Sequence, residues 1–429
     1  MLAGLFIVLL LLLLLGFPVL LVIGLLGFAG FVLAQLDPAL FPQRMFAALD
    51  SFSLLAMPYF ILAGELMTRG GLSKRLVEFS EKLVGHMRGG LGHASILACT
   101  AFGNVSGSAT AATAAIGSVL IPAMKDRGYR PGLAAALTGC SGLIGSIIPP
   151  SMVMIVYGSV AGVSIAGLFL GGYVPGLMMM AGLMLALYVH ALLPGFPELR
   201  AVAGRFSVRS AVASLPQVWT AVAAPVIILG GIISGIFTAT EAGVVACVYA
   251  FVIAFVVYRT VSLRDAPAIL VDAAVTTAMV VGIISVAGAL GWLLTYLDFN
   301  EVISGLILGI SGNPYVVILA LLGIMLVLTM FVESLAVLII LIPVIAQVGR
   351  TFGLDPLHLG ICVVLATQIG AVTPPVAVGL FVATGVAKTD YDRTMRHSIP
   401  FVLVLIAVLL LVLFVPGLAT WVQNCFLGR

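Results

Sequence analysis

The chain has 429 residues, of which 62% are apolar and only 8% are Asp, Glu, Lys or Arg, and its formal net charge is +3. Soluble domains carry roughly 25% charged residues, so 19 basic and 16 acidic side chains cannot cover a water-facing surface for a chain of this size. The composition excludes a soluble enzyme, a nucleic-acid-binding protein and a disordered regulator, and it predicts a polytopic α-helical membrane protein.

Long apolar runs follow one another along the whole chain. A membrane span needs about 20 apolar residues to cross the hydrocarbon core. In chain order, the candidate spans are 2–15, 18–34, 52–67, 93–124, 132–158, 164–193, 216–236, 238–258, 267–296, 314–348, 357–387 and 398–422. The first two runs could also form one tilted helix over 2–34, although the number of crossings in each half, given below, favours two helices that turn at Gly16-Phe17-Pro18.

Five cysteines are scattered through these runs without a CxxC pair and predict no disulfide framework.

Basic residues gather between the apolar runs and orient them. Sixteen of the 19 fall in five clusters, at 69–88, 125–130, 200–209, 259–264 and 388–396. The positive-inside rule places all five clusters in the cytoplasm. This requires 93–124 to enter and leave on one side, as a re-entrant hairpin with its tip near Gly103–Ser108. The same reasoning makes 314–348 a hairpin from the opposite side, with its tip near Met330–Ser334.

The two halves of the sequence resemble each other. GSIIPPSMVMIVYGSVAG (145–162) follows the first hairpin, and GAVTPPVAVGLFVATGVA (370–387) follows the second. Each half has five crossings and one hairpin, and because five is odd the halves must run in opposite senses through the membrane. The predicted fold is therefore an all-α polytopic membrane protein with an inverted-topology repeat, two re-entrant helical hairpins and two Pro-Pro-broken helices.

This topology divides the chain into scaffold, arm and transport segments. The predicted parts are scaffold helices 1–67, an amphipathic arm 68–92, a first transport repeat 93–193 with hairpin 93–124 and broken helix 132–158, a cytoplasmic loop and scaffold helices 194–296, a second arm 297–313, and a second transport repeat 314–422 with hairpin 314–348 and broken helix 357–387. In the first arm, Leu72, Leu76, Phe79 and Leu83 form one apolar side, which indicates a helix lying at the membrane interface.

Hairpin tips and helix breaks should meet near the membrane midplane, where discontinuous helices expose free carbonyls and free amides. Carbonyls and hydroxyls suit Na⁺, whereas amide ends suit an anion. The predicted Na⁺ ligands are Ser106, Gly107, Ser108, Thr110, Gly145, Ile148, Pro149, Glu333, Ser334, Gly370, Thr373 and Pro374. The predicted substrate contacts are Asn104, Ser108, Ser151 and Thr373.

Each of these assignments has a structural alternative. Small residues also permit close helix packing, and Glu333 could stabilise the start of the helix that follows it. Glu241 is predicted to belong to a helix cap made with Thr238 or Thr240, and Glu65 to pair with Arg69 one turn away. No Lys or Arg lies deep in a predicted span, so an anion would be held by helix N-termini and hydroxyls.

The chain resembles the large membrane subunit of tripartite ATP-independent periplasmic (TRAP) transporters, the DctM-like family. The matching stretches are LAGELMTRGGLSKRL (62–76), SGSATAATAAIGSVLIPAMKDRGY (106–129), GSIIPPS (145–151), GIFTATEAG (235–243) and QIGAVTPPVAVGLF (368–381). The resemblance implies a Na⁺-driven elevator-type transporter of the bacterial inner membrane, with a fold similar to that of divalent-anion/sodium symporters.

The resemblance also implies two protein partners, a small four-helix membrane subunit (DctQ-like) and a periplasmic binding protein (DctP-like). The binding protein would deliver an organic acid such as a C4-dicarboxylate or sialic acid. Na⁺ is the expected coupling ion, without an organic cofactor. A stand-alone Na⁺/dicarboxylate symporter of the same fold is the alternative, and a channel is more remote. Clustered acids, an HExxH motif and a paired catalytic Asp are missing from the sequence, so we expect no catalytic residues and no membrane enzyme.

Overall fold

The computed structural model describes the chain except residues 1–3, 5–7, 9–10, 13–14, 16, 201–206, 299–304, 306–308, 310–311 and 428–429. The structure is 81% helix, and its described residues contain no strand. This agrees with the predicted all-helical class. The predicted first span 2–15 and the predicted second arm 297–313 lie largely outside the described residues.

The described N-terminal helices are α2 (Val19–Leu33), α3 (Leu40–Leu49), η1 (Phe52–Leu55) and α4 (Ala56–Arg69). The chain bends by 66° between α3 and the segment from Phe52 to Arg69. The sequence did not predict α3, because a ten-residue helix with an arginine and a glutamine is too short and too polar to read as a span. The guanidinium of Arg44 lies 4.2 Å from the ring centre of Trp292 and ties α3 to α13 (Ala266–Tyr296).

The predicted first arm contains α5 (Leu72–Val84), which begins after Gly71. Of the predicted apolar side, Leu72 and Leu76 are buried whereas Phe79 and Leu83 are half-buried, and Val77 and Ser80 are buried as well. The side of α5 that faces the protein therefore coincides only in part with that apolar side. Helix α5 packs against the two hairpin helices that follow it.

The first hairpin consists of α6 (Gly90–Ser106) and α7 (Ala109–Asp126), which pack against each other. The following segment is broken as its prolines predict: α8 (Pro131–Gly142) continues into η2 (Leu143–Ser146), and α9 (Met152–Ala161) begins only after Pro149-Pro150. Helix α10 (Ile165–Leu192) completes this half.

The middle of the chain forms α11 (Val208–Ile233), α12 (Ala239–Phe251), η4 (Val252–Val257) and α13. Thr238 and Glu241 form the predicted cap of α12, each side chain bonding the other residue's backbone N–H. The predicted pair of Glu65 with Arg69 is wrong. Arg69 instead forms an ion pair with Asp272, because packing of α4 against α13 brings a second carboxylate to the arginine.

The second half contains α15 (Pro314–Thr329), α16 (Ser334–Phe352), α17 (Pro356–Gly370), α18 (Val378–Ala387), α19 (Tyr391–Phe414) and α20 (Gly417–Leu427). The predicted span 398–422 is wrong in its bounds. Helix α19 starts seven residues earlier and ends before Pro416, because proline lacks an N–H and disfavours helix at the preceding residue.

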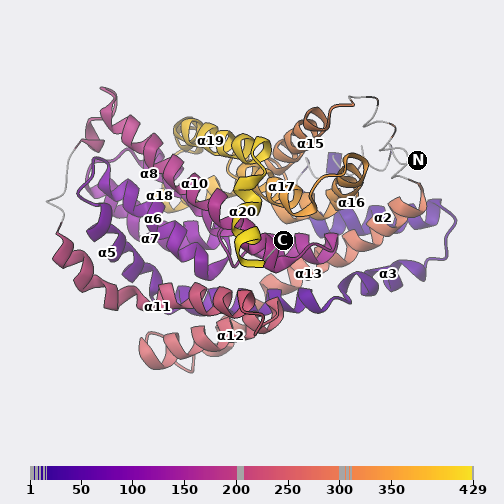
Figure 1. The fold of residues 1–429 in the computed structure, drawn as a ribbon, viewed down its shortest axis with the longest axis horizontal. Helices are drawn as coiled ribbons and strands as arrows, with labels where there is room; N and C mark the ends of the chain where they lie inside the picture. The colour runs from indigo at the N-terminus through magenta and orange to yellow at the C-terminus, as the bar shows by residue number, and fades with distance from the viewer. Residues whose placement is uncertain are drawn as a thin grey trace.

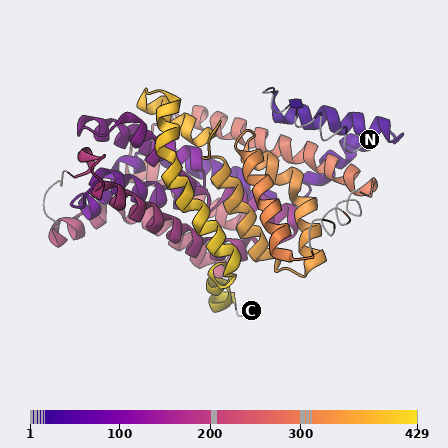
Figure 2. The same cartoon turned by 90° about the horizontal axis from the view of Figure 1, so that it is seen from above.

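Among the described residues, five helices are long and apolar enough to cross a membrane, and the bent pair from α3 to α4 could make a sixth. Figure 1 shows α11 and α12 along one edge of the molecule and α8 and α19 along the opposite edge. In Figure 2 the first half (purple) and the second half (orange) lie side by side, with α19 across their junction. Helix α9 packs against α16 and α17, and α18 packs against α7 and α8, so the halves share one core.

Candidate functional site

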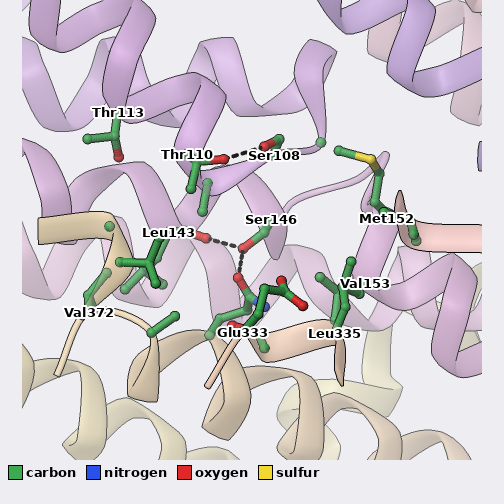
Figure 3. A pocket seen from close by; sticks show the side chains of 18 of the residues that line it. Ser108, Thr110, Thr113, Leu143, Ser146, Met152, Val153, Glu333, Leu335 and Val372 are labelled. Carbon is green, nitrogen blue, oxygen red and sulfur yellow. Dashed lines mark hydrogen bonds between the residues drawn. The ribbon is translucent and has the colours of Figure 1, made fainter. Parts of the chain in front are cut away.

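A cavity of about 360 Å³ lies where the two halves and α13 meet. Both hairpin breaks, both interrupted helices and one face of α13 contribute to its wall. Its polar lining residues are Ser108, Thr110, Thr113, Ser146, Thr276, Glu333, Ser334 and Gln368. Figure 3 shows several of these side chains converging from segments that are more than 200 residues apart in the sequence.

The first hairpin break reaches the cavity through Gly107 and Ser108. Gly107 has a φ of +62°, and a side-chain carbon there would lie 2.5 Å from the carbonyl oxygen of Pro150, so only glycine fits against the proline break. The Ser108 hydroxyl caps α7 by accepting a hydrogen bond from the Ala111 N–H at 3.3 Å, and it lies 3.2 Å from the Thr110 hydroxyl. The tip thus presents hydroxyls beside the positive end of α7.

The second hairpin break has a related arrangement. The Glu333 carboxylate caps α16 by accepting a hydrogen bond from the Ala336 N–H at 3.1 Å, and the Ala377 N–H donates to the Met330 carbonyl at 3.2 Å. Ser108 and Glu333 are 225 positions apart, as are Pro149 and Pro374. The residues that cap α7 and α16 beside the cavity therefore precede their respective Pro-Pro pairs by the same number of positions.

Ser146 and Gln368 link the interrupted helices of the two halves. The Ser146 hydroxyl lies 2.7 Å from the Gln368 side-chain oxygen and 2.7 Å from the Leu143 carbonyl. Ser146 is 2% exposed and Gln368 is 4% exposed, so this contact is shielded from competing water. A shielded bond of this kind fixes the relative position of η2 and α17 at the cavity wall.

Glu333 is the one ionisable residue among the described residues that line the cavity, and its side chain is accessible. The N-termini of α7, α9 and α16 lie at the wall, and free amides at helix starts attract anions. Hydroxyls and the Glu333 carboxylate offer the oxygen ligands that hard cations require. Within the described part of the chain, no three His, Cys, Asp or Glu side chains are grouped as a metal centre. The cavity combines groups that suit an anion with oxygen groups that suit a hard cation.

Five of the residues predicted for the site line the cavity: Gly107, Ser108, Thr110, Glu333 and Ser334. The other nine do not line it: Asn104, Ser106, Gly145, Ile148, Pro149, Ser151, Gly370, Thr373 and Pro374. The Ser151 hydroxyl caps α9 and donates to the Ser146 carbonyl, and the Thr373 hydroxyl donates to the Ile369 carbonyl at 2.6 Å. Both hydroxyls therefore already form hydrogen bonds with backbone atoms.

Close packing explains several of the remaining positions. A side-chain carbon on Gly103 would lie 2.0 Å from the Gly145 Cα, and one on Gly370 would lie 1.8 Å from the Thr329 hydroxyl. The Ile148 side chain points away from the cavity and packs on Gly176 of α10. The side-chain oxygen of Asn104 is buried without a hydrogen-bond partner among the described residues. These positions bring the hairpins against the broken helices rather than forming the wall.

Sequence reasoning missed Thr113, Ser146, Gln368 and the residues of α13. Gln368 carried a usable signal, because it is an amide inside an otherwise apolar run. Thr113 follows Thr110 by three residues and therefore shares its helix face. Met279, Val280 and Ile283 of α13 carried no signal, because apolar residues that face a cavity look the same in the sequence as those that face lipid.

The comparisons with known proteins agree with one another. The model of the family "Tripartite ATP-independent periplasmic transporter, DctM component" matches residues 6–418. The sialic acid TRAP transporter large permease protein SiaM of Vibrio cholerae is 36% identical over 386 residues, which cover 90% of each chain. The C4-dicarboxylate TRAP transporter large permease protein DctM of Pseudomonas aeruginosa is 36% identical over 381 residues, which cover 89% of this chain and 88% of that protein.

A solved structure is also similar. The crystal structure of the Alcanivorax borkumensis YdaH transporter, described as having an unusual topology, matches with a TM-score of 0.61 over 85% of each chain. At 13% sequence identity, this likeness concerns the fold alone. The family model spans nearly the whole chain, and the chain is therefore a multi-pass membrane protein that belongs to the DctM family of TRAP transporter large permeases.

Proposed function

We propose that this chain is the large membrane subunit of a Na⁺-driven TRAP secondary transporter in a bacterial inner membrane. It takes up an organic acid that a periplasmic binding protein delivers, and it works together with a small four-helix membrane subunit. The observation that carries this proposal is the cavity at the junction of both hairpin breaks, both interrupted helices and α13, in a chain that belongs to the DctM family.

The substrate is proposed to be a carboxylate such as a C4-dicarboxylate or sialic acid, the compounds named for the two relatives. Such an anion fits a wall in which helix N-termini supply partial positive charge. Na⁺ would bind beside it, at the hydroxyls of the first hairpin break and at Glu333 in the second. The cation would offset the charge of the carboxylate, and this mutual attraction would couple the two fluxes.

Alternating access is proposed to occur by an elevator movement. The moving domain would comprise 93–193 and 314–422, and the scaffold 1–67 and 216–296. Two features support this division. Seven of the eight polar residues in the described cavity lining belong to the hairpins and broken helices, whereas α13 contributes Thr276 beside the apolar Met279, Val280 and Ile283. No hydrogen bond of a described residue joins these α13 side chains to the rest of the wall, and such an apolar contact suits sliding because few hydrogen bonds need to break.

Uptake in proteoliposomes tests the proposal. The chain is reconstituted with its small membrane partner, with and without an inward Na⁺ gradient, and binding proteins preloaded with labelled C4-dicarboxylate or sialic acid are added outside. We expect uptake that needs both the gradient and a binding protein. Uptake of free substrate with Na⁺ alone would support a stand-alone symporter instead, and equilibration without accumulation would indicate a channel.

Ser146→Ala is expected to lower the initial uptake rate at limiting substrate by about tenfold, because Gln368 loses a shielded partner at the wall. Ser141→Ala is the matched control, since the Ser141 hydroxyl is buried in the same helical segment and bonds only the Leu137 carbonyl. Initial rates across substrate concentrations, at equal amounts of reconstituted protein, measure the effect. Equal initial uptake rates for the two variants would show that the Ser146–Gln368 contact does not contribute to uptake.

A further inference from the structure

A second cavity, of about 190 Å³, shares no lining residue with the central one. Its lining residues are Leu133, His190, Phe196, Arg396, His397 and Pro400. His190 lies two residues before the end of α10, and Arg396 and His397 lie in the second turn of α19. Helix α19 packs against both α8 and α10 in this part of the molecule (Figure 1).

The position of this cavity relative to the membrane follows from those two helices. Both α10 and α19 are long and apolar enough to span the bilayer, and the cavity adjoins the last turn of one and the start of the other. The ends of a span lie at the level of the lipid headgroups. The surrounding basic residues belong to the clusters that the positive-inside rule places in the cytoplasm. The cavity therefore opens at the inner-leaflet headgroup layer.

The positive charge of Arg396 has no partner among the described residues, since no carboxylate lies within ion-pair distance of it there. Two neighbouring arginines are compensated. Arg130 lies 3.1 Å from the Glu198 carboxylate, and Arg393 lies 3.2 Å from Asp390. Positive-inside orientation alone explains a basic cluster, but it does not explain why Arg396, which has no carboxylate partner among the described residues, lines a cavity.

The two histidines have a defined orientation. The Nδ1 atom of His190 lies 2.8 Å from the Ala186 carbonyl, and that of His397 lies 2.7 Å from the Arg393 carbonyl. A carbonyl oxygen only accepts hydrogen bonds, so Nδ1 carries the proton in both rings and Nε2 is the remaining nitrogen. The Phe196 ring stands edge-on to both imidazoles, with centroids 5.2 Å from His190 and 6.5 Å from His397. The rings are thus positioned before any ligand arrives.

We propose that this cavity binds a phosphate group, supplied by the headgroup of an anionic phospholipid or by free phosphate in the cytoplasm. A guanidinium presents paired N–H donors that match phosphate oxygens, and protonation of either imidazole adds a donor at Nε2. The volume equals that of about six waters of liquid, which is ample for a phosphate. Basic pockets between membrane helices on the cytoplasmic side are suited to lipid headgroups.

Native mass spectrometry of the full chain in a neutral detergent tests this inference without any transport measurement. Phosphatidylglycerol or phosphatidylcholine is titrated onto the wild type, onto Arg396→Gln with His397→Asn, and onto Arg393→Gln. The last variant is the control, because it removes the same charge one turn earlier in α19 from a residue outside the cavity lining. A thermal melt without lipid verifies that all three proteins are equally folded.

We expect the wild type to bind one phosphatidylglycerol more tightly than phosphatidylcholine, and the double variant to weaken that binding about fivefold, while Arg393→Gln retains it. Displacement of the lipid by millimolar inorganic phosphate would assign recognition to the phosphate itself, and resistance to displacement would assign it to the complete headgroup. Equal losses in the double variant and in the control, or no preference over phosphatidylcholine together with no binding of phosphate, would overturn the proposal. Because the readout is binding, these outcomes are independent of the proposed transport function.

Discussion

Gly103→Ala is expected to abolish uptake and to lower the thermal stability of the purified subunit. The new Cβ would lie 2.0 Å from the Gly145 Cα, a backbone atom that cannot move without shifting η2. Overpacking of this kind costs about 1–3 kcal/mol or more, which exceeds the gain of about 1 kcal/mol that alanine brings within a helix. Uptake in proteoliposomes and a thermal melt in detergent measure the two effects.

Gly385→Ala is the matched control, because Gly385 is also helical but has no atom within 4 Å of an added side-chain carbon. It should leave uptake unchanged and stability equal or slightly higher. Gly370→Ala should behave like Gly103→Ala, since its Cβ would lie 2.6 Å from the Leu326 carbonyl and 1.8 Å from the Thr329 hydroxyl. Normal uptake by the Gly103 variant would show that the first hairpin does not need this close approach.

Glu333→Gln is expected to raise the Na⁺ concentration for half-maximal uptake about tenfold, a change equivalent to about 1.4 kcal/mol. The substitution keeps the shape of the side chain but removes the one carboxylate at the described cavity wall. A charged ligand contributes more to a cation site than a neutral amide does. Rates measured across Na⁺ concentrations, at saturating binding protein and substrate, give the value.

Glu333→Gln changes a helix cap as well as a proposed cation ligand, and a second variant is needed to separate these two effects. Glu241→Gln serves this purpose, because Glu241 belongs to the cap of α12 and is not among the cavity-lining residues. Both variants should lose a little stability, but only Glu333→Gln should change the Na⁺ dependence. Equal Na⁺ dependence in the two variants would leave Glu333 with the capping role alone.

Much of the architecture was predictable because it depends on local chemistry. The membrane class follows from composition, and several helix interruptions follow from residues that disfavour continuing a helix. Gly107 and the two Pro-Pro pairs end helices in the structure as their backbone preferences require. The Thr238–Glu241 cap was predictable for the same reason, because its two partners are three residues apart.

The site was only partly predictable, because its members come from separate segments. Ser146 and Gln368 are 222 positions apart, and nothing local distinguishes the serine that meets a glutamine from Ser151, which satisfies its own backbone. The glycines could not be told apart from the sequence either. Gly107 lines the cavity, whereas Gly145 and Gly370 make close contacts with neighbouring helices outside the lining.

The membrane class, several of the helix breaks and the family can be inferred without a structure, because apolar content, proline, glycine and motif residues act over a few neighbours. The tertiary structure alone decided which small polar residues face the cavity, that α13 closes it, and that Arg69 pairs with Asp272 rather than with Glu65. Those outcomes depend on the relative rotation and depth of packed helices. They are set by the sum of many weak contacts across the whole core, which no local pattern records.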